Sequence, residues 1–146
     1  MATRSNIAII LKEEDKARVF AELNKRLEDT GYKFRYGVDN GNVLQIYCHW
    51  DGYPEGVGAD LLRDFNSYDK ALELILEGDH STPYEPYAGR GESWASNCPD
   101  QRTEPKREQN YLYVFKDGEW KIPTKDDDYE DLIDEDGYVN LKDYLN

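Results

Sequence analysis

The sequence contains only two cysteines, Cys48 and Cys98, in 146 residues. Two cysteines without a short CxxC spacing favour neither a disulfide framework nor a zinc site, so we expect a reducing, cytosolic setting. Long hydrophobic runs are also missing, because no stretch reaches the roughly 18 apolar residues that a transmembrane helix needs. The first residues show no cleavage-type signal pattern. We therefore expect neither a membrane span nor a secretory signal.

Basic residues are scarce. The chain has 18 Lys and Arg against 31 Asp and Glu, which gives a formal net charge of −13. Repulsion between carboxylates and phosphates disfavours direct binding to nucleic acid or to anionic membranes. The same charge suits a well-solvated surface, or a protein partner that carries a basic surface. Hydrophobic residues make up 38%, and the 12 tyrosines indicate a core that depends on aromatic side chains.

The apolar patterns predict strands near the N-terminus and in the middle of the chain. Residues 6–11 are apolar and rich in β-branched side chains, which is typical of a buried strand. Two strand-like runs, 32–38 and 43–50, flank Asn40 and Gly41, and Asn-Gly is a strong hairpin signal. We therefore predict a hairpin here.

A second hairpin is predicted from residues 111–115 and 119–122, which flank Asp117 and Gly118. Apolar residues at three- and four-residue spacing predict helices over 13–30 and 54–65, and Ser67 is a plausible N-cap for a third helix. The expected fold class is α+β: a mostly antiparallel sheet, built from the two hairpins and the N-terminal strand, covered by about three helices.

The remaining segments predict one domain with an acidic extension. Residues 79–110 lack a clear period, so we expect a long loop there, with one short strand over 92–95. We assign residues 1–123 to a single α+β domain and 124–146 to an acidic C-terminal tail, and we leave open whether the tail docks on the domain.

One motif is specific. Residues 46–58 read IYCHWDGYPEGVG, and weaker matches lie at 3–9, 78–79 and 111–120. Together these stretches resemble a family of small proteins found largely in tailed-phage genomes. The resemblance touches about half of the chain. It implies a phage setting, and hence the host cytoplasm, but it implies no activity.

The motif also suggests a ligand site. Aromatic side chains and glycines at the start of a predicted helix suit an anion or a nucleotide, and a cation from the long loop would complete the site. The candidate ligand-binding residues are His49, Trp50, Asp51, Tyr53, Glu55 and Arg90. The structural alternative is that the aromatics are core and that the glycines let helix and sheet approach closely.

Two catalytic interpretations of the same motif are weaker. His49 and Asp51 would have to meet Asp79 and His80 to hold a divalent metal, with Glu55 as a base. Cys48 cannot pair with the adjacent His49, because neighbouring residues of a strand point to opposite faces. We therefore expect a structural thiol, no assigned catalytic or metal-binding residue, and no cofactor.

The C-terminal segment carries eight acidic residues within positions 126–136. Interleaved apolar residues make this run a plausible ligand for a basic groove, and the candidate partner-binding residues are Asp127, Asp128, Tyr129 and Asp131. Positions 132–143 also resemble an EF-hand loop, but Leu132 replaces the first ligand and Asp143 replaces the usual Glu. The sequence leaves calcium binding open beside a simple Asp-Gly turn.

These observations favour a non-enzymatic phage accessory protein that binds a host protein with a basic surface. The process served would be host takeover or counter-defence, with DNA mimicry as one form of it. The alternative is a small-ligand protein, either a nucleotide-sequestering binder or a metal-dependent hydrolase, that uses the stretch from His49 to Glu55.

Overall fold

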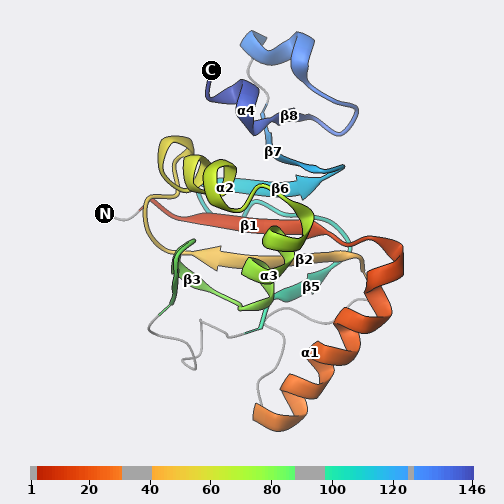
Figure 1. The fold of residues 1–146 in the computed structure, drawn as a ribbon. Coiled ribbons are helices and arrows are strands. Elements are labelled where there is room, and N and C mark those ends of the chain that lie inside the picture. Colours follow the sequence, from red (N-terminus) through yellow and green to blue (C-terminus); the bar gives the residue numbers. More distant parts are fainter. Residues whose placement is uncertain (1–2, 31–40, 88–97, 125–126) are drawn as a thin grey trace.

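The computed structural model describes residues 3–30, 41–87, 98–124 and 127–146. Within these ranges the chain forms one eight-stranded sheet with helices α2 and α3 on one face (Figure 1). This arrangement confirms the α+β class. The strands are β1 (Ser5–Ile10), β2 (Val43–Cys48), β3 (His80–Thr82), β4 (Glu85–Pro86), β5 (Asp100–Arg102), β6 (Tyr111–Lys116), β7 (Glu119–Pro123) and β8 (Tyr138–Asn140).

The sheet is mixed, so the expectation of a mostly antiparallel sheet is wrong. The strand order is β4-β3-β2-β1-β6-β7-β8, with β5 also paired to β2. Strand β1 runs antiparallel to β2 but parallel to β6, and β3 runs parallel to β2. Both parallel pairs join segments that are far apart in the chain, and local turn signals carry no information about such pairs.

The predicted loop over residues 79–110 contains three short strands, β3, β4 and β5, which the sequence pattern missed. Each has only two or three residues, too few for an alternating pattern to be recognised. The proposed strand over 92–95 and the first arm of the predicted hairpin, 32–38, lie outside the described residues. The partners of β2 in the described sheet are β1, β3 and β5.

The second hairpin is confirmed. Strands β6 and β7 pair antiparallel with Lys116 opposite Glu119, and the two residues between them have positive φ, 54° at Asp117 and 81° at Gly118. Positive φ at both central positions defines the type I′ turn that suits a tight hairpin. Asp and Gly adopt this conformation at low cost, so the turn type follows from these two residues.

The helices fill the space over one face of the sheet. The hydrophobic core joins Ile7, Ile9, Leu44 and Ile46 of the sheet to apolar side chains of the helices, such as Ile75. None of the helices in the described part of the chain is long and apolar enough to cross a membrane. The helices are α1 (Lys16–Thr30), α2 (Ala59–Asp64), α3 (Tyr68–Leu76) and α4 (Leu141–Tyr144), with short turns η1 (Glu13–Asp15), η2 (Pro54–Gly58) and η3 (Asp127–Leu132).

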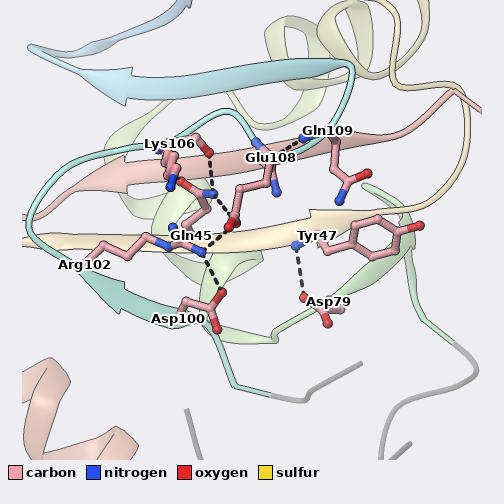
Figure 2. Close-up of polar contacts among 9 residues, drawn as sticks. Gln45, Tyr47, Asp79, Asp100, Arg102, Lys106, Glu108 and Gln109 are labelled. Atoms are coloured by element: carbon pink, nitrogen blue, oxygen red, sulfur yellow. Dashed lines mark hydrogen bonds and ion pairs between the residues drawn. The ribbon is translucent and has the colours of Figure 1, made fainter. Parts of the chain in front are cut away.

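The other face of the sheet is covered by an extended segment, residues 103–110. The Asn6 side-chain oxygen accepts hydrogen bonds from the main-chain N–H groups of Glu108 and Gln109, at 2.8 and 2.9 Å. The Gln45 amide donates to the Lys106 carbonyl at 2.8 Å and accepts from the Lys106 N–H at 3.0 Å (Figure 2). The two buried side-chain amides thus form hydrogen bonds with main-chain groups of a segment that is not paired as a strand. These bonds hold the segment on the sheet.

The C-terminal segment extends the sheet. Strand β8 pairs with β7 through Ile122 and Val139, and Val139 and Leu141 are fully buried. Figure 1 shows β8, α4 and η3 together at the β7 end of the sheet. Residues 138–144 therefore form a strand followed by a short helix. Their apolar side chains complete the core beside Trp120, which is itself fully buried.

The N-cap of α3 gives a direct test of these local assignments. The Ser67 hydroxyl oxygen accepts a hydrogen bond from the Lys70 N–H at 3.2 Å. We predict that Ser67→Ala lowers the free energy of unfolding by about 1 kcal/mol, because that N–H loses its acceptor. Ser67→Asp, which keeps an acceptor at the cap, should stay near wild type. Urea unfolding of the three proteins measures this, and equal stability of wild type and Ser67→Ala would contradict the assignment.

Candidate functional site

The stretch from His49 to Glu55 forms the loop that leaves β2 and enters η2. Its first two N–H groups continue the pairing with β3, because His49 and Trp50 donate to the carbonyls of His80 and Ser81 at 3.0 and 2.8 Å. The Gly52 N–H then donates to the Thr3 carbonyl at 2.8 Å. The loop is therefore tied to two segments distant in the chain.

Two glycines of this loop lie where a side chain has no room. A Cβ added at Gly56 would fall 2.3 Å from the Asp51 carbonyl oxygen, and one at Gly52 would fall 2.7 Å from the Arg4 carbonyl carbon. Asp51 has φ of +53°, which turns its carbonyl to accept a hydrogen bond from the Val57 N–H at 2.8 Å. Close packing thus accounts for these glycines.

His49 sits in a cluster of aromatic rings. Its Nδ1 lies 2.6 Å from the Tyr47 hydroxyl oxygen, and its ring centroid is 4.5 Å from Trp50 and 5.3 Å from Tyr87. Burial, helped by the positive charge of Arg4, lowers the pKa of His49 below its usual 6.5. The imidazole is therefore neutral near pH 7, and one of its nitrogens is engaged with Tyr47.

Other side chains of the loop point outward. Trp50 is 48% exposed and Tyr53 is 39% exposed, and Asp51 and Glu55 are exposed beside them. The Tyr53 hydroxyl donates a hydrogen bond to the Asp51 carboxylate at 3.3 Å. These four predicted residues therefore present aromatic and carboxylate groups to solvent. The sixth predicted ligand residue, Arg90, lies outside the described residues.

The predicted metal ligands have separate roles. The buried Asp79 carboxylate accepts a hydrogen bond from the Tyr47 N–H at 3.0 Å (Figure 2), while the Nδ1 of the buried His80 lies 2.6 Å from the Gly78 carbonyl. Asp51 is bonded to Tyr53 on the exposed loop. In the described part of the chain, no three His, Cys, Asp or Glu side chains lie where they could hold a metal ion together.

Cys48 is buried on β2, and its thiol donates to the Ser81 carbonyl across 3.7 Å. Burial raises its pKa to about 12, so the thiolate that nucleophilic chemistry requires does not form near neutral pH. The geometry fits the structural thiol expected from the sequence.

The predicted partner-binding residues lie on or beside η3. Asp128 and Asp131 are exposed, and Asp127 begins the same turn, although its side chain is outside the description. Tyr129 faces inward: its ring stacks on Tyr144 with centroids 5.0 Å apart, and its hydroxyl donates to the Tyr144 carbonyl at 3.4 Å. Tyr129 thus attaches η3 to α4.

Leu132, at the end of η3, is 51% exposed, the highest value among the large apolar side chains that the structure describes as exposed. Acidic residues surround it in the chain. We call the exposed residues Asp128, Glu130, Asp131, Leu132 and Glu135 the acidic surface. In the sequence, Leu132 stands out only as a departure from the EF-hand pattern, because its exposure cannot be read from the acidic run around it.

Asp134 organises the turn that follows. Its Oδ1 accepts hydrogen bonds from the N–H groups of Asp136 and Tyr138 at 2.9 and 3.0 Å, and its Oδ2 pairs with the Lys121 ammonium at 3.0 Å. Gly137 completes the turn with φ of +85°. The Asp-x-x-Gly spacing is the local signal of this turn. The Asp134 carboxylate, a central member of the EF-hand-like pattern, is thus occupied within the protein.

Comparisons with protein-family models, with curated proteins and with solved structures return no match to this chain.

The packing at Gly56 yields one prediction. We expect Gly56→Ala to lower the free energy of unfolding by about 2 kcal/mol, because the new methyl group must displace the main chain at Asp51. Glu55→Ala, at the exposed neighbouring position, should change it by no more than about 0.5 kcal/mol. Denaturant unfolding compares the two variants. A Gly56→Ala protein as stable as Glu55→Ala would show that the loop packs differently.

Asp134 yields a pH prediction. Burial raises its pKa, but the bonds from Tyr138, Lys121 and Asp136 outweigh burial and bring the pKa below the ordinary 3.8. A carboxylate with a lowered folded-state pKa contributes stability that is complete above its unfolded pKa and is lost as the pH falls through the folded value. We therefore expect Asp134→Asn to cost about 1–3 kcal/mol at pH 7 and to reduce the loss of stability between about pH 5 and pH 3.

The matched control is Asp143→Asn, which removes one exposed carboxylate from the same segment. Its stability should follow wild type at every pH. Urea unfolding at several pH values measures all three proteins. An Asp134→Asn protein with the acid sensitivity of wild type would contradict the assigned role.

Proposed function

We propose that this protein is a phage accessory protein that acts by binding a host protein with a basic surface, without catalysis, in host takeover or counter-defence. The phage setting comes from the resemblance of residues 46–58 to small tailed-phage proteins. The binding mode comes from the C-terminal segment, which holds nine acidic and two basic residues over 124–146 and so carries seven of the thirteen net negative charges.

The observation that carries the proposal is the exposure of Leu132 within the acidic surface. In this proposal Leu132 makes an apolar contact, and the exposed carboxylates near it in the chain pair with basic groups of the partner. The surrounding carboxylates would attract a basic partner over distance and orient it on approach.

The attachment of η3 adds a second argument. Stacking of Tyr129 on Tyr144 and the bonds of Asp134 hold the acidic surface on the folded domain. A segment that is already ordered loses less conformational entropy on binding than a free acidic tail does. In this proposal Asp127, Asp128 and Asp131 contact the partner, and Tyr129 positions them. A DNA-binding protein is one partner that such a surface suits.

A charge-reversal pair tests the proposal. Host proteins retained by the immobilised full-length chain are identified, and the most strongly retained one is purified for calorimetric titration. We predict that the double variant Asp128→Lys, Asp131→Lys binds this host protein at least about ten-fold more weakly than wild type does, because two attractive contacts become repulsive. Leu132→Ser should weaken binding at unchanged net charge, which separates the apolar contact from the electrostatic one.

The matched control is Glu13→Lys with Glu14→Lys, which makes the same change in net charge at two exposed positions of η1. Its affinity should stay within about three-fold of wild type at moderate salt, where distant charges are screened. No retained host protein, or equal weakening by both double variants, would reject the acidic surface as the contact site.

A small-ligand site in the loop after β2 is the second candidate, and the exposure of Trp50 and Tyr53 beside Asp51 favours it. Asp51→Gly removes the carboxylate while keeping the positive φ at low cost, so it separates binding from folding. Under this alternative, Asp51→Gly abolishes function and the acidic-surface variants preserve it. The first proposal requires the reverse.

A further inference from the structure

A cavity of about 630 Å³ lies between the core of the sheet and the C-terminal segment. Its walls come from the start of β6, the end of β7, the start of β8, α4 and the segment that covers the second face. A volume of this size falls within the range of small-molecule sites. The lining residues that matter here are Arg107, Tyr111, Leu112, Ile122, Tyr138 and Tyr144.

The cavity lies where the β6–β7 ladder ends, and both Leu112 and Pro123 line it. Their pairing begins at Lys116 and Glu119 and ends at Val114 and Lys121. In an antiparallel ladder every second pair is hydrogen-bonded, so the next bonded pair would join Leu112 to Pro123. Pro123 has no N–H to donate toward β6, and β8 pairs with the other edge of β7. The Leu112 carbonyl therefore lacks the donor that this pair would normally supply. A ligand with an N–H group in the cavity can supply one.

The charges around the cavity leave one cation available. Lys116 pairs with Asp136, and Lys121 pairs with Asp134. Arg107 is exposed at the cavity and forms no ion pair with any residue that the structure describes. The lining also includes Asp136, whose carboxylate is paired with Lys116, so Arg107 is the cation of the cavity lining that a ligand can reach. A guanidinium presents paired donors that match the oxygens of a phosphate or carboxylate.

The walls of the cavity suit a flat ring. Tyr111, Tyr138 and Tyr144 line the cavity and are each partly buried. Tyr111 stacks on Tyr113, Tyr144 stacks on Tyr129, and the Lys116 ammonium lies over the Tyr138 ring, so a ligand would meet the remaining face or edge of each ring. Leu112 and Ile122, each 3% exposed, add apolar surface. Aromatic side chains pack on heteroaromatic rings with little dependence on ring substituents. The cavity thus combines ring surfaces, a main-chain carbonyl and a cation.

We propose that this cavity binds a nucleoside monophosphate, with the phosphate on Arg107, the base among the three tyrosines and an N–H group of the base on the Leu112 carbonyl. This site is separate from the loop after β2 and from the acidic surface, so it does not depend on the function proposed above. A bound nucleotide would bridge β6 and β8.

Calorimetric titration of the full chain with AMP, GMP, CMP and dTMP tests the proposal. At least one nucleotide should bind with a Kd of about 0.1 mM or tighter, and its nucleoside and inorganic phosphate should each bind at least about ten-fold more weakly. Arg107→Gln should weaken the nucleotide by at least about ten-fold, since it loses a charge-assisted contact, and Arg107→Lys should restore part of the affinity.

Arg18→Gln is the control, because Arg18 is an exposed arginine on α1. It should leave the affinity unchanged. The NMR chemical shifts of backbone amides on addition of the nucleotide should locate the binding site, with the largest changes at Leu112 and Tyr138. Binding of none of the four nucleotides at millimolar concentration would overturn the proposal. So would equal affinities of wild type and Arg107→Gln, or shifts confined to the loop after β2.

Discussion

The C-terminal part of this protein depends on strand β7, which pairs with β6 along one edge and with β8 along the other. Strand β7 pairs with β6 from Glu119 to Lys121 and with β8 from Lys121 to Pro123. Pro123 cannot donate a main-chain hydrogen bond toward β6, so the ladder on that side ends early. Because the second edge of β7 carries β8, β8 and α4 can bury Val139 and Leu141 against the core. The cavity lies where the β6–β7 ladder ends, beside Leu112 and Pro123.

This arrangement separates the two conspicuous stretches of the sequence. Contacts with the buried part of the protein hold the motif loop after β2. The Tyr113 hydroxyl, on strand β6, donates a hydrogen bond to the Gly52 carbonyl at 2.6 Å, and two glycines of the loop lie against the main chain. Such packing explains why the motif needs its glycines, whatever its exposed aromatic side chains contact. Contacts of Tyr129 and Asp134 hold the acidic segment on the domain, and the carboxylates of the acidic surface remain exposed.

Local chemistry could be predicted from the sequence, and long-range pairing could not. The Asp117–Gly118 turn, the Ser67 cap and the buried first strand follow from residue types and spacing. The parallel pairing of β1 with β6 joins residues about a hundred positions apart, and no turn residue reports it. The candidate sites show the same limit. The run of carboxylates could be recognised in the sequence, but the packing of Tyr129 could not, because it depends on Tyr144, fifteen residues further along the chain.

Hydrogen exchange of the full-length protein tests the central claim, that residues 129–145 are part of the fold, most directly. The pairing of Val139 with Ile122 predicts that the Val139 amide exchanges slowly, by the same opening event as amides of β7. The amide of Tyr138, bonded to the Asp134 carboxylate, should be protected with it. Exchange of both amides at the rate of an unstructured peptide, while β1 and β6 stay protected, would contradict the account and leave the acidic residues on a free tail.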